Sequence, residues 1–316
     1  MALGMYEQIA RNKRASWVLM STVVLLLLAL GFTIGLAYWG SVEGGLGFLG
    51  LFGVVAIVWS LISYYAGAGM ALAVSGAREV DHGTEPQLWN VVEEMSIAAG
   101  LPMPRVYVIE SEAPNAFATG RDPAHAAVAV TRGLLQKLNR EQLQGVIGHE
   151  LSHVRNYDIR FATLVGIMVG MIALIADFFL RSTFWGFGGR RRSGGGGGIQ
   201  AIFFVVALAL AILAPLSARL VQFAISRKRE YLADASAVQL TRNPSGLADA
   251  LQKIAADPTP LRRANRATAH LYISNPVRKL RERANLFDTH PPIADRIRIL
   301  RAMAYETPTQ EDLAAL

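Results

Sequence analysis

The chain has 316 residues, of which 52% are hydrophobic and only 17% are charged, whereas soluble proteins average about 25% charged residues. Its net charge of +7 is spread beside apolar segments rather than gathered with aromatic residues. Attraction to anionic lipid therefore accounts for this charge more simply than nucleic-acid binding does. The absence of cysteine excludes disulfide bonds and thiolate metal ligands, so any metal ion must be held by His, Asp or Glu.

Four long apolar runs predict an integral membrane protein. They cover residues 17–38, 46–72, 161–180 and 199–213. Each run reaches or approaches the roughly 20 residues that a membrane-spanning helix requires. Basic residues precede the first run and none lies in the link over 40–47, which favours a cytoplasmic N-terminus under the positive-inside rule. We therefore expect an uncleaved N-terminal hairpin that returns the chain to the cytoplasm.

After this hairpin the sequence has the character of the first half of a soluble domain. Apolar residues at helical spacing and short alternating runs mark its elements. The patterns predict a helix over 85–99, a strand over 105–109, a turn over 115–120, a strand over 126–131 and the start of a helix at 134–138.

The next predicted helix, opened by Asn139 as its N-cap, carries an H-E-x-x-H motif. Residues four apart lie on one helix face, so His149 and His153 can bind a single Zn²⁺. Glu150 directly follows the first ligand and is placed to act as a general base. A solvated helix surface with two histidines is the alternative interpretation. We expect this helix to continue through residue 160, whose polar neighbours place the histidines before the bilayer.

A second helix after the fourth apolar run presents Glu230 and Asp234 on one face. Two His, one Glu and an open fourth position are typical of catalytic zinc sites. Glu230 is therefore the candidate third ligand, and Asp234 can accept the distal N–H of a ligand histidine. The alternative is a charged helix surface.

Ligands on both sides of the third and fourth runs constrain the topology, because the chain must cross the bilayer an even number of times between them. Two crossings satisfy this constraint, and so does a re-entrant or peripheral hairpin with a Gly/Arg loop at 186–198. The length of the runs favours two crossings. The chain is thus divided into an N-terminal transmembrane hairpin (1–75), a first catalytic half (76–160), a second hairpin (161–222) and a second catalytic half (223–316).

The motifs resemble those of the HtpX-type membrane zinc metalloproteases, relatives of the CAAX prenyl endopeptidases. The resemblance rests on the runs 149–158, 229–234, 115–118 and 289–292, together with Arg296. It implies a mainly α integral membrane protein with about four transmembrane helices and a cytoplasmic zincin-like α+β domain with a small β-sheet. It also implies a multi-pass protease of the bacterial cytoplasmic membrane that binds one Zn²⁺ per subunit and acts on polypeptides, including membrane proteins, in quality control.

The resemblance suggests two further groups of site residues. His290 and Arg296 are expected to reach the cleft and stabilise the developing oxyanion, although His290-Pro291-Pro292 also fits a plain helix N-terminus. Asn115, Ala116, Phe117 and Ala118, with the strand over 126–130, suggest an exposed edge strand that binds an extended peptide. Ordinary sheet packing is the alternative for these four residues.

The predicted reaction is peptide hydrolysis by a zinc-activated water with Glu150 as base. An intramembrane protease is disfavoured by the polar residues 155–160 that follow the motif. A membrane chaperone or scaffold that keeps zinc only for structure is the alternative from a different class. The sequence does not predict an oligomeric state.

Overall fold

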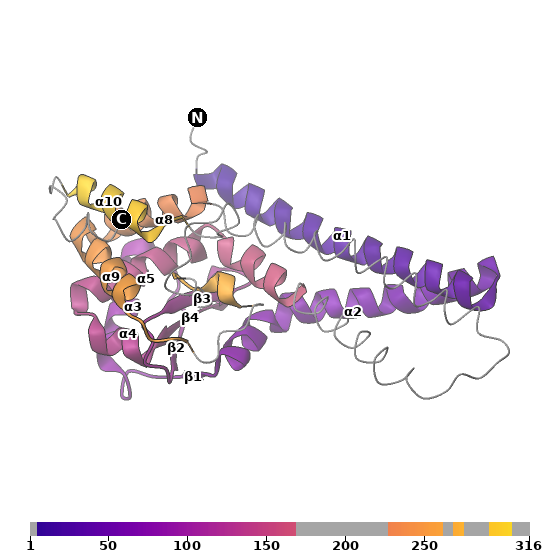
Figure 1. Ribbon diagram of the computed structural model, residues 1–316, viewed down its shortest axis with the longest axis horizontal. Helices are drawn as coiled ribbons and strands as arrows, with labels where there is room; N and C mark the ends of the chain where they lie inside the picture. Colours follow the sequence, from indigo (N-terminus) through magenta and orange to yellow (C-terminus); the bar gives the residue numbers. More distant parts are fainter. Residues whose placement is uncertain (1–4, 169–226, 262–267, 275–290, 305–316) are drawn as a thin grey trace.

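The computed structural model describes residues 5–168, 227–261, 268–274 and 291–304. The third apolar run beyond residue 168, the whole fourth run, the Gly/Arg loop and His290 lie outside the described residues. In the described part, a long helical hairpin projects from a domain in which helices cover a small β-sheet (Figure 1).

The hairpin consists of α1 (Met5–Trp39) and α2 (Val42–Ser75), which run antiparallel. The segments Ile9–Leu36 and Val42–Ser75 are long and apolar enough to cross a membrane, and only 33% and 17% of their most apolar stretches are buried. Leu51, Val54 and Ile57, for example, are each more than half exposed, at 56%, 62% and 56%. A core helix of a soluble domain would bury such side chains, so this surface fits a lipid environment. The two predicted N-terminal spans are confirmed as long apolar helices.

Four strands form a mixed sheet in the order β1-β2-β4-β3. They are β1 (Ala77–Glu79), β2 (Arg105–Ile109), β3 (Ala116–Gly120) and β4 (Ala126–Thr131). β2 and β4 are parallel, and the two outer pairs are antiparallel. The predicted strands over 105–109 and 126–131 are confirmed, but the predicted turn over 115–120 is wrong, because β3 is the edge strand there. All five of its residues are buried, so it lacks the alternation of polar and apolar side chains that marks a half-exposed strand.

Helices cover one face of the sheet, and the end of the hairpin reaches the other. The other labelled elements are α3 (Pro86–Ala99), η1 (Pro123–His125), α4 (Arg132–Lys137), α5 (Arg140–Arg155), α8 (Arg227–Thr241), α9 (Pro244–Ala256), η2 (Ala269–Leu271) and α10 (Ile293–Met303). On the first face Val108 and Val130 share a buried cluster with Ile147 of α5. On the second face Phe117 is buried with Leu72 of α2. Both faces are therefore covered, and α5 lies against the sheet.

Both ends of the motif-bearing helix α5 are defined by local interactions. At its start the predicted N-cap Asn139 accepts from the backbone N of Gln142 at 2.9 Å, and the Gln142 side chain accepts from the backbone N of Asn139 at 3.1 Å. At its end the helix stops at Arg155, so the prediction of one helix through residue 160 is wrong. Tyr157 adopts a left-handed conformation with φ of 59°, which costs roughly 1–2 kcal/mol for a residue with a Cβ. A new helix then covers residues 158–168.

Gly145 allows α9 to pack directly on α5, since a Cβ at this position would lie 2.9 Å from both Cα and N of Leu247. We expect Gly145→Ala to lower the melting temperature, because the backbone of α9 must shift and such overpacking costs about 1–3 kcal/mol. Thermal unfolding in detergent, followed by tryptophan fluorescence, measures this change.

Gly69→Ala is the matched control, because a Cβ on this glycine of α2 would meet nothing within 4 Å. Equal melting temperatures for the two variants would contradict the assigned contact.

Candidate metal centre

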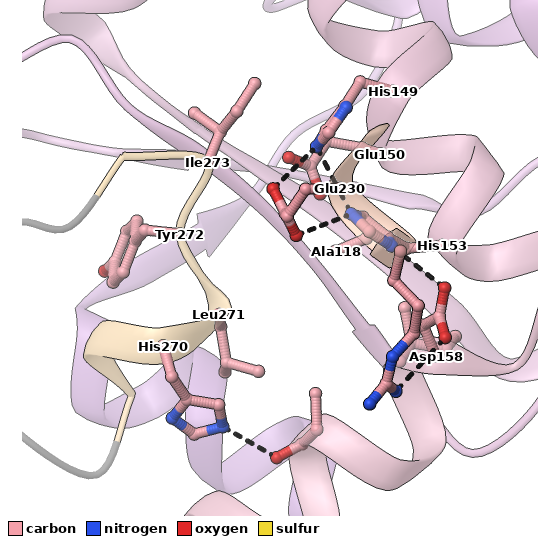
Figure 2. Close-up of a pocket in the computed structure, with 13 residues that line it drawn as sticks. Ala118, His149, Glu150, His153, Asp158, Glu230, His270, Leu271, Tyr272 and Ile273 are labelled. Atoms are coloured by element: carbon pink, nitrogen blue, oxygen red, sulfur yellow. Dashed lines mark hydrogen bonds and ion pairs between the residues drawn. The ribbon is translucent and has the colours of Figure 1, made fainter. Parts of the chain in front are cut away.

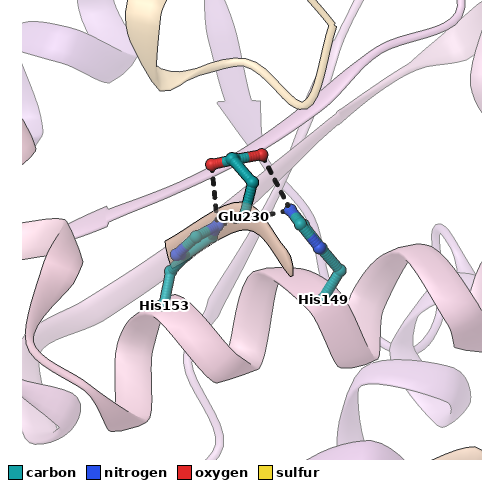
Figure 3. A group of neighbouring side chains, drawn as sticks. All are labelled: His149, His153 and Glu230. Carbon is teal, nitrogen blue, oxygen red and sulfur yellow. Dashed lines mark hydrogen bonds and ion pairs between the residues drawn. The ribbon is translucent and has the colours of Figure 1, made fainter. Parts of the chain in front are cut away.

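Two helices that are distant in the sequence bring three donor groups together. His149 and His153 project from the same side of α5, and Glu230 faces them from α8 (Figure 3). The two Nε2 atoms are 3.2 Å apart, and the Glu230 carboxylate oxygens lie 3.7 Å from that of His149 and 3.6 Å from that of His153. Tetrahedral zinc with bonds of about 2.0–2.1 Å places its donors roughly 3.3 Å apart. The donor positions therefore fit a single zinc ion.

The histidine tautomers strengthen this assignment. His149 Nδ1 lies 2.9 Å from Asp234 Oδ1, and His153 Nδ1 lies 3.1 Å from Asp158 Oδ2. An ionised carboxylate can only accept, so the neutral form of each histidine carries its proton on Nδ1. Both Nε2 atoms then direct lone pairs toward one point, and the Glu230 carboxylate faces the same point. A bound cation satisfies all three donors at once.

A buried arginine holds Asp234 in place. Arg296 of α10 is 0% exposed, and it donates from Nε to Asp234 Oδ2 at 2.8 Å and from Nη2 to Oδ1 at 2.6 Å. Its Nη1 lies 3.5 Å from Glu230 Oε2. Burial alone would raise the pKa of Asp234, but the charge and hydrogen bonds of Arg296, with the hydrogen bond from His149, lower it to about 2. Asp234 therefore stays ionised beneath the metal centre.

Glu150 is the fourth chemically important group. It is 2% exposed and lines a cavity of about 40 Å³ together with the three donors (Figure 2). Burial, with the nearby charge of Glu230, raises its pKa to about 7, although the charge of His153 opposes this shift. A carboxyl group with such a pKa can both accept and return a proton near neutral pH.

A model of peptidase family M48 matches residues 83–304, a range that contains the three donors and Glu150. The chain belongs to peptidase family M48. It is 46% identical over 306 residues to a protein of Listeria monocytogenes serovar 1/2a named Protease HtpX homolog, an alignment that covers 95% of this chain and all of that protein. A protein of the same name from Levilactobacillus brevis is 47% identical over 302 residues, again covering 95% of this chain and all of that protein.

Among solved structures, S. mikatae Ste24p resembles this chain with a TM-score of 0.48 and 18% identity, over 93% of this chain and 67% of that one. The family assignment confirms the predicted resemblance, and the protein is a metalloprotease.

In this M48 peptidase, residues 115–118 do not form the fully exposed edge strand that the sequence predicts. Of residues 115–118 only Ala118 lines the cavity. Ile273 donates its backbone N–H to the Ala116 carbonyl at 2.9 Å, and Asn115 Nδ2 donates to the Ser274 carbonyl at 2.9 Å. The expectation of an exposed edge is therefore wrong at these positions, because a segment about 160 residues later in the chain lies along it.

Arg296 also differs from its expected place. It was predicted to reach the cleft, but it lies behind His149 and does not line the cavity, with Nη2 3.3 Å from His149 Nδ1. Arg296 is therefore not positioned to contact the reacting oxygen. His290, its predicted companion, lies outside the described residues.

Asp158 is a site residue that the motif did not reveal. In the sequence it is one of several polar residues after H-E-x-x-H, but the turn at Tyr157 brings its carboxylate back to His153 (Figure 2). Burial would lower the pKa of His153, yet the hydrogen bond with Asp158 and the charges of Glu230, Asp158 and Glu150 raise it to about 9 in the metal-free protein. An acidic residue within about one turn of a ligand histidine is the signal that could have found it.

We expect Glu230→Ala to abolish tight zinc binding, because only two donors remain. Asp234→Asn should weaken zinc affinity by roughly 10–100-fold, since it removes the charge that orients His149. Competition with a chromophoric chelator in detergent measures both effects.

His125→Ala is the control, because this histidine is exposed on η1 and bonds Asp122 instead. Tight one-to-one zinc binding by Glu230→Ala would contradict the assigned site.

Proposed function

We propose that this protein is a zinc-dependent endopeptidase that cleaves misfolded polypeptides and membrane proteins at the cytoplasmic face of the bacterial inner membrane. The observation that carries this proposal is the convergence of His149, His153 and Glu230 beside the buried carboxyl group of Glu150. A scaffold that used zinc only for structure would close the fourth metal position with another side chain. Here the space beside the donors is a cavity lined by Glu150.

His149, His153 and Glu230 would hold one Zn²⁺ per subunit. When bound, Zn²⁺ lowers the pKa of a coordinated water to about 7 and polarises a carbonyl group. Glu150 accepts a proton from the attacking water as its oxygen bonds to the scissile carbonyl carbon. Glu150 then delivers this proton to the departing amine as the carbon–nitrogen bond breaks.

The other predicted site residues have supporting roles in this proposal. Asp234 keeps His149 in the tautomer that binds metal, and Arg296 keeps Asp234 ionised and oriented. His290 remains our candidate for contact with the developing oxyanion. Ala118 is the part of β3 that faces the cavity, so an extended substrate would pass beside it rather than beside residues 115–117.

The helical hairpin indicates on which side of the membrane the catalytic domain lies. The N-terminal end of α1 and the C-terminal end of α2 both meet the catalytic domain (Figure 1), so this domain lies on the same side of the bilayer as the N-terminus. Arg11, Lys13 and Arg14 near that end favour the cytoplasmic side. We propose that residues 161–222 form a second hairpin, which brings the total to about four membrane helices and connects the catalytic halves 76–160 and 223–316.

Replacing Glu150 tests the proposed reaction. Glu150→Gln keeps the size of the side chain but cannot accept a proton, so we expect casein hydrolysis by the zinc-loaded protein to fall by at least 10²–10⁴-fold. Zinc affinity, measured on the same preparation, should stay within a few-fold of wild type.

Glu94→Gln on α3 is the control, because this exposed carboxylate bonds Arg140 and lies outside the cavity. Full activity of Glu150→Gln would exclude Glu150 as the base. Absence of zinc-dependent hydrolysis in wild type and Glu94→Gln alike would favour the scaffold instead.

A further inference from the structure

A buried asparagine on the first candidate membrane helix contacts the support of the metal centre. Asn12 of α1 is 4% exposed. Its Nδ2 donates to Asp158 Oδ1 at 2.6 Å and to the backbone carbonyl of Asn156 at 2.8 Å. Asp158 in turn bonds His153 through its other oxygen, Oδ2, at 3.1 Å. One carboxylate therefore separates α1 from a metal ligand.

The chemistry of these partners determines how the Asn12 amide is oriented. Asp158 Oδ1 and the Asn156 carbonyl are both acceptors, so only the NH₂ end of the amide can face them. With one N–H directed to each acceptor, both donors of the amide are used. The two bonds hold the Asp158 carboxylate in position relative to the last turn of α5.

A neighbouring contact stabilises the same turn. Lys13 Nζ lies 4.2 Å from the centre of the Tyr157 ring, and Tyr157 is the residue with the left-handed backbone. Two consecutive residues of α1 thus contact residues 156–158, which include the point where the chain bends to return Asp158 to His153. The same oxygen, Asp158 Oδ1, also lies 3.4 Å from Arg229 Nη1 of α8.

We propose that Asn12 is a positioning residue for the metal centre. It holds Asp158 so that the carboxylate keeps the proton of His153 on Nδ1 and leaves Nε2 available to zinc. The hairpin that contains α1 would then help to position the metal centre as well as anchor the protein in the membrane. This inference rests on the proposed zinc site, but it concerns metal affinity and is measured without any peptidase assay.

A double-mutant cycle tests the proposal on the full-length protein in detergent, with zinc affinity measured by chelator competition. We expect Asp158→Asn to weaken zinc binding by roughly 10–100-fold and Asn12→Leu to weaken it by about 10-fold. If Asn12 acts through Asp158, adding Asn12→Leu to Asp158→Asn should change the affinity by less than about 2-fold, because coupled residues are not additive. An equal effect of Asn12→Leu in both backgrounds, or no effect in either, would overturn the proposal.

A second pair of variants keeps the test valid if Asn12→Leu folds poorly. Asn12→Asp places two carboxylates together and should weaken zinc binding at least as much as Asn12→Leu does. Combining it with Asp158→Asn exchanges donor and acceptor between these two side chains and restores their hydrogen bond, but it leaves the Asn156 carbonyl without its donor. The double variant should therefore recover part of the affinity that Asn12→Asp loses. Failure of this exchange to recover any affinity would also contradict the assigned role.

Thr22→Val is the matched control on the same helix, since the Thr22 hydroxyl bonds the Val18 carbonyl within α1. It should bind zinc as wild type does. Loss of zinc affinity in this control would show that α1 acts through general stability instead. If the wild-type protein showed no peptidase activity but the zinc affinities of the cycle were as expected, the proposed function would be contradicted and the role of Asn12 would stand.

Discussion

The electrostatics of a buried donor cluster constrain much of this structure. Two imidazole nitrogens and a carboxylate converge within 4.8 Å, and two of the three groups, His149 and Glu230, are buried. Such groups lose hydration and repel one another unless charge of the opposite sign is supplied. A metal ion bound by the three donors would supply it at the centre, and Arg296 supplies it from behind, between Asp234 and Glu230. Arg296 is itself fully buried. Arg296, Asp234 and Glu230 therefore form a network in which the loss of one side chain leaves the charge of another uncompensated.

This network makes distant elements interdependent. Arg296 lies on α10 and contacts His149, 147 residues earlier in the chain, so α10 must dock before the centre is complete. The docking in turn requires α5, α8 and α9 to pack closely, which Gly145 permits by exposing the backbone of α5 to that of α9. The reactive geometry is therefore a property of the assembled helices and not of the motif alone.

The parts of the site that could be predicted from the sequence are those specified by local spacing. Residues four apart on a helix identify His149 with His153 and Glu230 with Asp234, and an N-cap followed by Gln142 marks where α5 begins. The end of α5 carried no such signal, because Tyr157 enters the left-handed region without being Gly, Asn or Asp. The sequence predicts a turn where β3 lies, because the mostly small residues of this strand are buried on both faces and show no alternation. The depth of Arg296 and the contact of Asn12 with Asp158 depend on tertiary packing, which no local pattern reports.

The two histidines are supported from different parts of the chain. His149 depends on Asp234 and Arg296, which belong to the C-terminal half. His153 depends on Asp158, which contacts α1 through Asn12 and α8 through Arg229. A displacement of the hairpin would therefore disturb His153 and leave His149 in position. Because the proposed zinc site needs all three donors together, weakening one of them would be sufficient to couple the position of the membrane hairpin to zinc binding.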